Sequence, residues 1–384
     1  MINTAPIGEL CTFKNGGTPQ KSEPSYWNGT IPWITSADIV DGEVHTPRSF
    51  ITEEAIRRSA TNLVSAGTIL LVTRTGVGKI AQTSINLCFS QDITAIEPDP
   101  NKIDTRYLIR FLEGCQAHFS RSSRGATIKG ITREAIETLK IPLPSLKEQR
   151  RIAAILDKAD ALRQKRRISI KLASELVRST FHQRFEIENS DEKHFLPLDE
   201  ICEKITDGTH QAPNWSPSGI PFLFVSNIRN QKISFDTTNY ISSEEYSRLT
   251  KNTPIETGDV LYTAVGSYGH AAVVPSNRTF AFQRHIAHLK PKLSIVNPYF
   301  LSLALEAPGA KRQADREARG VAQKTVTLAS LKKLKIPLPP IRDQENFANF
   351  HSKVLRHSLH EEASLNSLDA IFTSLQHLAF SGKL

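Results

Sequence analysis

Leu139-Lys-Ile-Pro-Leu-Pro144 and Leu334-Lys-Ile-Pro-Leu-Pro339 are the same six-residue string, which the chain contains twice, 195 residues apart. Further upstream, Gly17-Thr18 aligns with Gly208-Thr209, so the similarity extends through both halves. A period of about half of the 384 residues indicates a tandem duplication, because the units of solenoid proteins are only about 20 to 50 residues long. The sequence therefore predicts two similar domains rather than a repeat array.

Within each half, the residue pattern changes at this string. Before it, short apolar runs such as 68–73 and 259–263 alternate with clusters of Gly, Pro, Asn and Ser, which is typical of short strands and loops. After it, apolar residues recur at helical spacing, and Pro144 and Pro339 precede each helix because proline tolerates only the first turn. We expect an α+β fold with two similar mixed α/β domains, 1–144 and 195–339, followed by helical regions 145–187 and 340–384.

Each expected helix is roughly 40 residues, or about 60 Å, long and carries one apolar stripe that needs a partner. We expect the two helices to pack on each other as an antiparallel coiled coil about a pseudo-two-fold axis. The predicted seam consists of Ile152, Ile155, Ala159, Leu162, Ala173 and Leu176 in the first helix and of Phe347, Phe350, Val354, Leu368, Ile371, Leu375 and Leu378 in the second. Charge agrees with this pairing, since 145–187 carries 11 Lys/Arg against 5 Asp/Glu, whereas 341–384 carries 4 against 5.

Both seams turn polar near the middle of the helix. There Arg166 and Glu361 are separated by the same 195 residues as the repeated string. An axis near the helix centre would bring them together, and a polar contact in a seam fixes its register. We expect an Arg166–Glu361 contact; the alternative is that both side chains face water.

The composition describes an ordinary globular chain with a basic balance. Its 48 Lys/Arg against 39 Asp/Glu give a formal net charge of +9, which favours a polyanionic partner such as nucleic acid. Four scattered cysteines exclude a disulfide framework and a CxxC pair. No apolar run approaches membrane-spanning length and no secretory leader precedes the first domain, so we expect a cytoplasmic protein without a membrane partner.

Three segments resemble catalytic motifs without matching them. The segment 73–79 lacks the first glycine and the final Ser/Thr of a phosphate-binding loop. Asn297-Pro298-Tyr299 lacks the second proline of an adenine methyltransferase motif and is typical of a helix start. The histidines and glutamate of 357–361 do not have the spacing of a zinc protease. We predict no catalytic residue and no metal ligand, with a site assembled from distant residues left open.

The sequence resembles the specificity subunit of type I restriction-modification enzymes over essentially the whole chain. The resemblance is carried by the string 139–144, the Glu148-Gln149 pair that follows it and the C-terminal residues 379–384. The second half departs slightly, with Asp343 where the first has Glu148. The resemblance implies two target-recognition domains that each read one half of an asymmetric, bipartite site in double-stranded DNA. It also implies helices that set the gap between the half-sites and bind methylation subunits, expected to be two.

The same resemblance implies a subunit without catalysis of its own. S-adenosylmethionine would be bound by the methylation subunits, and ATP with Mg²⁺ by restriction subunits. Two other functions stay open on the sequence alone: a structural adaptor with tandem protein-binding domains, and a self-contained methyltransferase or nuclease.

Candidate DNA contacts come from polar loops flanked by glycine, where the backbone can approach a groove closely. In the first half they are Lys14, Thr18, Gln20, Lys21, Arg74, Thr75, Lys79, Arg124 and Lys129. In the second half they are Lys204, Thr209, His210, Gln211, Ser267, Tyr268, Arg284, Arg319 and Lys324. The alternative for each residue is an exposed loop position with no DNA contact.

Overall fold

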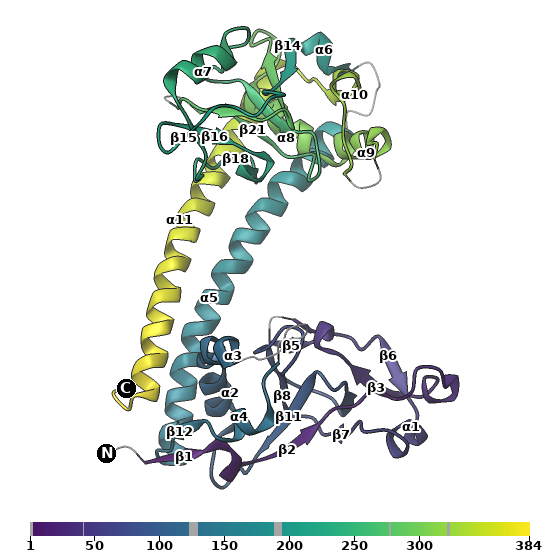
Figure 1. Ribbon diagram of the computed structural model, residues 1–384, viewed down its shortest axis with the longest axis vertical. Coiled ribbons are helices and arrows are strands. Elements are labelled where there is room, and N and C mark those ends of the chain that lie inside the picture. Colours follow the sequence, from purple (N-terminus) through teal and green to yellow (C-terminus); the bar gives the residue numbers. More distant parts are fainter. Residues whose placement is uncertain (1–2, 41, 123–129, 188–193, 276–277, 321–322) are drawn as a thin grey trace. The chain divides into compact units, whose positions relative to one another are not determined.

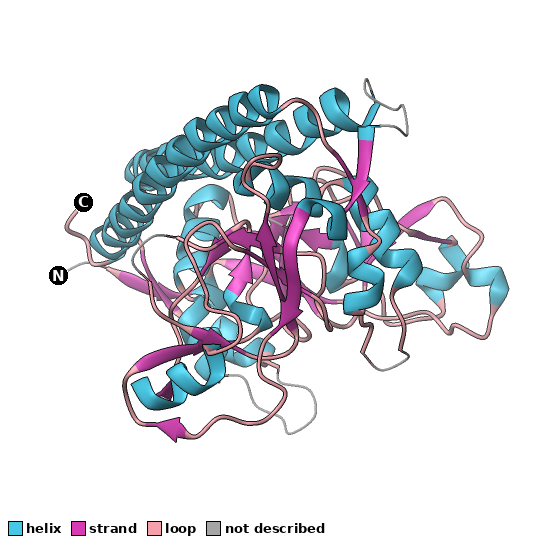
Figure 2. Cartoon of the chain, turned by 90° about the horizontal axis from the view of Figure 1, so that it is seen from above, coloured by secondary structure: helices cyan, strands magenta, loops and turns pink. Residues whose placement is uncertain are grey.

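The computed structural model describes residues 3–40, 42–122, 130–187, 194–275, 278–320 and 323–384. The chain divides into two compact units: unit 1 is Met1–Arg167 with Ala363–Leu384, and unit 2 is Ile168–Glu362. Strands and helices are mixed in both units (Figures 1 and 2), which confirms the expected α+β class.

Unit 1 is built around the four-stranded sheet β2-β11-β8-β9, in which every pairing is antiparallel. Its odd and even side chains separate as in any strand: Ile69 and Leu71 of β8 pack towards helix α2, whereas Leu70 and Val72 face a second sheet, β6-β3-β10-β7. The strands of unit 1 are β1 Thr4–Pro6, β2 Cys11–Asn15, β3 Ile31–Ile34, β4 Ile39–Val40, β5 Glu43–Val44, β6 Ser49–Ile51, β7 Leu63–Val64, β8 Ile69–Val72, β9 Ile80–Gln82, β10 Leu87–Phe89, β11 Ile93–Pro98 and β12 Lys140–Pro142. Its short helices are α1 Glu53–Arg57, α2 Thr105–Gly114, α3 Gln116–Ser122 and α4 Arg133–Glu137.

Unit 2 repeats this topology with the sheet β14-β23-β20-β21, so the duplication is present in the fold as well as in the sequence. Its strands are β13 Phe195–Pro197, β14 Cys202–Asp207, β15 Trp215–Ser216, β16 Ile220–Leu223, β17 Ile228–Arg229, β18 Lys232–Ile233, β19 Tyr240–Ile241, β20 Val260–Thr263, β21 Ala271–Val273, β22 Ala281–Phe282, β23 Ile286–Pro291 and β24 Lys335–Pro337. Its short helices are α6 Leu198–Ile201, α7 Ser243–Thr250, α8 Pro298–Glu306, α9 Pro308–Glu317 and α10 Leu328–Lys332. Asn297 caps α8 and Pro298 is its first residue, as the sequence predicted.

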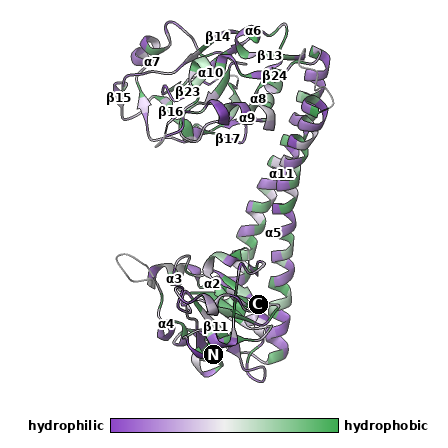
Figure 3. Cartoon of the chain, turned by 90° about the vertical axis from the view of Figure 1, so that its right-hand side faces the viewer, coloured by the Kyte–Doolittle hydropathy of each residue, from purple (hydrophilic) through white to green (hydrophobic). Residues whose placement is uncertain are grey.

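Two long helices, α5 Leu146–Phe181 and α11 Ile341–Phe380, contribute residues to both units. Each begins within two residues of the proline that ends the repeated string, and they contain 36 and 40 residues. The first is followed by a π-helical turn, His182–Ile187. Apolar and polar residues alternate along both helices (Figure 3), as expected for helices that are covered on one side only.

A buried glutamine ties the start of each long helix to its domain. In unit 1, Gln149 Oε1 accepts a hydrogen bond from the Asp104 backbone N–H (2.8 Å), and its Nε2 donates to the Lys102 and Pro144 carbonyls (3.3 and 2.9 Å). In unit 2, Gln344 makes the same three contacts, with the Asn297 N–H (2.9 Å) and with two carbonyls (3.0 and 2.8 Å). Both side chains are fully buried, so the Gln of the Glu-Gln and Asp-Gln pairs is a structural residue in each half.

The two long helices run antiparallel within each unit. In unit 1 the early residue Ile152 of α5 shares a core with the late residues Phe372 and Ala379 of α11. In unit 2 the late residue Phe181 of α5 packs on the early residue Phe347 of α11, with ring centroids 5.5 Å apart.

Three residues of the predicted helix seam are exposed instead of buried. Leu162, Leu176 and Ile371 are 47%, 51% and 53% exposed, and Phe372 is buried in place of Ile371. The seven-residue pattern assumes that each helix contacts only its partner, but both helices also pack on the domain cores. A straight helix drifts by about 20° per heptad, so the buried face shifts away from the predicted stripe.

Candidate nucleic-acid interface

In unit 1, four loops meet beside the end of β2. They are the turn after β2, the turn after β8, the segment between β10 and β11, and the residues that precede α4. Gly16 and Gly17 allow the turn after β2 to pack closely against the segment after β10, since a Cβ on Gly16 would lie 2.0 Å from the Ser90 carbonyl oxygen. Between the loops lies a cavity of about 640 Å³, lined by Asn15, Gly16, Thr73, Arg74, Gln91, Ile93, Thr94, Gly130, Ile131, Thr132 and Arg133.

The turn 73–79 in this group connects β8 to β9. Thr75, Gly76 and Gly78 have φ of +39°, +99° and +92°, so the chain turns sharply in a conformation that favours glycine. A strand follows the turn, whereas a phosphate-binding loop leads into a helix. The segment is therefore a loop that follows a strand and not a phosphate-binding loop.

The structure brings only some of the predicted residues of unit 1 to the cavity. Arg74 is exposed on its wall, and Thr18 donates its hydroxyl to Gln91 Oε1. Lys14 is ion-paired to Glu97 (2.9 Å). Lys79 points instead to the Ser36 and Ile39 carbonyls (3.4 and 3.2 Å) and lines a different cavity.

The remaining predicted residues of unit 1 lie in loops or outside the described part. Gln20 and Lys21 are exposed in the turn after Gly17, and Thr75 is exposed at the tip of the β8–β9 turn. Arg124 and Lys129 lie outside the described residues.

Unit 2 contains the same meeting of loops, recognised by its backbone hydrogen bonds. The Gly16 N–H donates to the Ile93 carbonyl at 3.3 Å, and the Gly208 N–H donates to the Ile286 carbonyl at the same distance. Gly208 is therefore equivalent to Gly16, and the sequence alignment of Gly17 with Gly208 was wrong by one residue at this turn. A Cβ would clash with the facing strand at both glycines, which is why glycine occurs in both halves.

A second pair of hydrogen bonds fixes the equivalence of the loops before β11 and β23. The Thr73 N–H donates to the Asp92 carbonyl (2.8 Å), and the Ala264 N–H donates to the His285 carbonyl (2.9 Å). Asp92 thus corresponds to His285, and the preceding residue, Gln91, corresponds to Arg284.

The predicted residues of unit 2 differ in their surroundings. His210 contacts the Asp207 carboxylate (3.0 Å), and Thr209 donates its hydroxyl to the Gln211 carbonyl (3.0 Å). Lys204 donates to the Asn252 carbonyl (2.8 Å). Gln211, Ser267, Arg284, Arg319 and Lys324 are exposed.

Tyr268 is held by its neighbours rather than free to reach a ligand. Its hydroxyl donates to Asp315 (2.6 Å), and Lys311 lies over its ring, 5.4 Å from the centroid. The hydrogen bond to Asp315 raises the pKa of Tyr268. The pKa of His285, next to Arg284, is lowered by burial and by the Arg284 charge, so this loop presents a neutral imidazole beside a cation near pH 7.

Sequence reasoning missed Gln91 and the wall residues Asn15 and Arg133. A signal for Gln91 was present, because each half has three polar residues between a phenylalanine and a β-branched strand start, Phe89-Ser-Gln-Asp-Ile93 and Phe282-Gln-Arg-His-Ile286. Aligning these two strings pairs Gln91 with Arg284, but all three polar positions differ between the halves, so the sequence does not single out this one.

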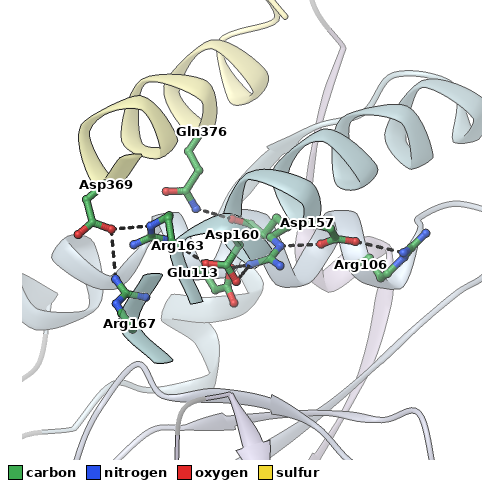
Figure 4. Close-up of polar contacts among 9 residues, drawn as sticks. Arg106, Glu113, Asp157, Asp160, Arg163, Arg167, Asp369 and Gln376 are labelled. Carbon is green, nitrogen blue, oxygen red and sulfur yellow. Dashed lines mark hydrogen bonds and ion pairs between the residues drawn. The ribbon is translucent and has the colours of Figure 1, made fainter. Parts of the chain in front are cut away.

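The other polar cluster of unit 1 joins α2, α5 and α11 (Figure 4). Arg110 of α2 contacts Asp157 (2.8 Å) and Asp160 (3.1 Å) of α5, and Arg163 of α5 contacts Asp369 of α11 (2.5 Å). Burial alone would lower the pKa of Arg110, but the surrounding carboxylates raise it overall, so this guanidinium stays charged. Part of the positive charge of α5, at Arg163, is thus neutralised by an acidic residue of the same unit.

The predicted contact between Arg166 and Glu361 stays a prediction. Arg166 belongs to unit 1 and Glu361 to unit 2. Glu361 is buried and Arg166 is half-buried.

Within the described ranges, no group of three or more His, Cys, Asp or Glu side chains could hold a metal ion. Nor does any helix in that part of the chain have the length and apolar character needed to cross a membrane.

Comparison with known proteins agrees with the duplicated fold. A family model described as the type I restriction modification DNA specificity domain matches residues 2–172 and again residues 190–370. The specificity subunit of a type I restriction enzyme from Escherichia coli is 33% identical over 163 residues, which cover 41% of this chain and 40% of that protein. Another, from Methanocaldococcus jannaschii, is 28% identical over 210 residues, which cover 53% of this chain and 47% of that protein. The chain thus spans less than half the length of these two relatives.

A solved structure extends the likeness to the whole fold. The S subunit of a type I restriction-modification system from M. genitalium is 17% identical, with a TM-score of 0.56 and coverage of 99% of this chain and 96% of that chain.

Proposed function

The chain belongs to the family of type I restriction modification DNA specificity domains, and from this we propose that it is the subunit that selects the DNA site of a type I restriction-modification complex. Each unit would read one half of a bipartite site. One observation carries the proposal: the two units place equivalent loops around equivalent backbone hydrogen bonds, yet present different side chains there, Gln91 in one and Arg284 in the other. Two similar readers with different side chains give an asymmetric site.

In this proposal the long helices set the gap between the half-sites. DNA readers with two recognition elements fix the separation of half-sites by the rigid part that joins them. α5 and α11 each extend through residues of both units without interruption, which suits such a spacer. The buried contacts of Gln149 and Gln344 support it, because they leave each domain little freedom at the start of its helix.

The helices would also bind the methylation subunits. Ile168, Leu172 and Leu176 follow one another at four-residue spacing on α5 and are 55%, 56% and 51% exposed. Apolar side chains at this spacing form one stripe on a helix, and an exposed stripe of this kind is typical of a protein-binding surface. S-adenosylmethionine would then be bound by the methylation subunits, and ATP with Mg²⁺ by restriction subunits, so that this chain chooses the site and the others act on it.

The DNA-binding surface should be local rather than spread over each domain. Without the two helical regions, the chain has 33 Lys/Arg against 29 Asp/Glu, a difference of only +4 over two domains. We therefore expect tight DNA binding to require the methylation subunits.

A gel-shift titration tests the function. The chain assembled with its methylation subunits should bind duplex DNA, and the logarithm of its affinity should fall linearly with the logarithm of the salt concentration. The chain alone should bind weakly. An assembled complex that binds no DNA, or binds it with an affinity independent of salt, would instead fit a structural adaptor.

A further inference from the structure

Position 91 of unit 1 and position 284 of unit 2 are the same place in the fold. Each lies two residues before an inner strand of its main sheet, β11 or β23. The next residue in each case, Asp92 or His285, accepts a backbone hydrogen bond at its carbonyl from the turn after β8 or β20. Both side chains are exposed beside the loops that the proposed function assigns to DNA. Two domains of one fold approach DNA in the same way, so the two side chains should meet equivalent positions of their half-sites.

Gln91 is set up to read a base edge. Its Oε1 accepts the Thr18 hydroxyl, which orients the amide and still leaves one lone pair on that oxygen, while neither Nε2 hydrogen is donated to another of the residues that the structure describes. An amide with one acceptor and one donor side by side matches the N6 amino group and N7 of adenine in the major groove.

Arg284 presents a different pattern from the same place. Its guanidinium is exposed and makes no side-chain hydrogen bond or ion pair with any residue in the part of the chain that the structure describes. Its donors match O6 and N7 of guanine, the commonest specific contact of arginine in the major groove.

We propose that Gln91 and Arg284 are specificity-determining residues at equivalent positions, Gln91 reading an adenine in one half-site and Arg284 a guanine in the other. A phosphate contact fits this position less well, because a neutral amide in one unit and a cation in the other would neutralise the backbone unequally. The inference rests on the proposed function and names the chemistry of its two reading positions.

The test exchanges the two side chains in the full chain, assembled with its methylation subunits, and maps the methylated sites. Arg284→Gln should replace a specified guanine by adenine in one half-site only, and Gln91→Arg should make the opposite change in the other half-site. Arg356→Gln, at an exposed position of α11, serves as the matched control and should leave every specified base unchanged. If either exchange lowers methylation of all sites uniformly, or leaves the specified bases unchanged, the inference is wrong.

A second measurement keeps the test informative should a variant methylate poorly. Duplexes in which each guanine of a mapped half-site is replaced in turn by 7-deazaguanine lack the N7 acceptor that Arg284 would use. One such replacement should weaken binding of the wild-type complex about tenfold and leave binding of the Arg284→Gln complex nearly unchanged. Equal sensitivity of both complexes at every guanine would overturn the assignment. A wild-type complex that methylates no bipartite site would overturn the proposed function, and this inference with it; a bipartite site that the exchanges do not alter would overturn this inference alone.

Discussion

The Nε atom of Arg163 in α5 lies 2.5 Å from Oδ1 of Asp369 in α11, and the Arg163 guanidinium lies 4.2 Å from the centroid of the Phe372 ring one turn away. Arg163 is only 17% exposed, so this ion pair is partly shielded from water. It joins the C-terminal part of α11 to a residue of α5 that lies 206 positions earlier in the sequence, and both residues belong to unit 1. The C-terminal part of α11 is therefore a structural component of unit 1.

Replacing Asp369→Asn should weaken this connection. We expect a loss of about 1 kcal/mol in the free energy of unfolding, because Asp369 is partly exposed and Arg163 keeps its contact with Asp160. The loss, measured by urea unfolding, should shrink as salt is raised, since salt screens the pair. Glu175→Gln, which removes an exposed ion pair within α5, the helix of Arg163, is the control and should have almost no effect. An Asp369→Asn variant as stable as the control would show that the pair contributes nothing.

Replacing either buried glutamine, Gln149 or Gln344, should lower the free energy of unfolding more than replacing Asp369. Gln149→Leu removes three hydrogen bonds and leaves a buried N–H and two carbonyls unpaired, which we expect to cost about 2 to 4 kcal/mol. Gln344→Leu should behave alike because its contacts are the same. Gln164→Leu, at an exposed position of α5, should be nearly neutral in the same urea titration. Neutral replacements at 149 and 344 would contradict the structural role assigned to the motif glutamine.

The helix contact of unit 2 should resist salt, since it is aromatic rather than ionic. Phe347 packs against Phe181, Phe185 and Phe350 with centroid separations of 5.2 to 5.6 Å. Phe347→Ala should cost about 3 to 5 kcal/mol at any salt concentration, whereas Leu359→Ala, at a half-exposed position of the same helix, should cost far less. A loss for Phe347→Ala that disappears in high salt would argue against this explanation.

Glu245 provides a pH-dependent test in unit 2. Its pKa is lowered to about 2, mainly by the hydrogen bond from Arg248 and also by the one from the Asn214 N–H, against the opposing effect of burial. A carboxylate whose pKa is lower in the folded state stabilises the fold above its unfolded value, near 4.3, and this contribution is lost as the pH falls towards 2. Glu245→Gln should thus be less stable than wild type at pH 7 and equal to it near pH 2. Glu244→Gln, the exposed neighbour on α7, should match wild type throughout, and a pH-independent difference at 245 would exclude the ionic explanation.

Much of the architecture could be predicted from local signals. The repeated proline string, the helical spacing after it and the glycines at tight turns are properties of short segments, and these predicted the duplication and both long helices. The exposed positions of Leu162, Leu176 and Ile371 could not be predicted in this way, because which face of a helix is buried depends on the domain packed against it.

The candidate site was less predictable for a related reason. Lys79 follows a glycine-rich turn, as a phosphate-contacting lysine would, but its ammonium group binds two carbonyls from another loop. Gln91 is one of many polar loop residues in the sequence, and only the hydrogen bonds between neighbouring strands place it opposite Thr18 and in the position of Arg284.

The most direct test of the central claim is to map every methylated adenine in DNA modified by the complex of this chain with its methylation subunits. Two different short sequences, separated by an unspecified gap of constant length and each containing a modified adenine, are the expected result. A single uninterrupted recognition sequence, two identical half-sites, or methylation that does not depend on this chain would contradict it.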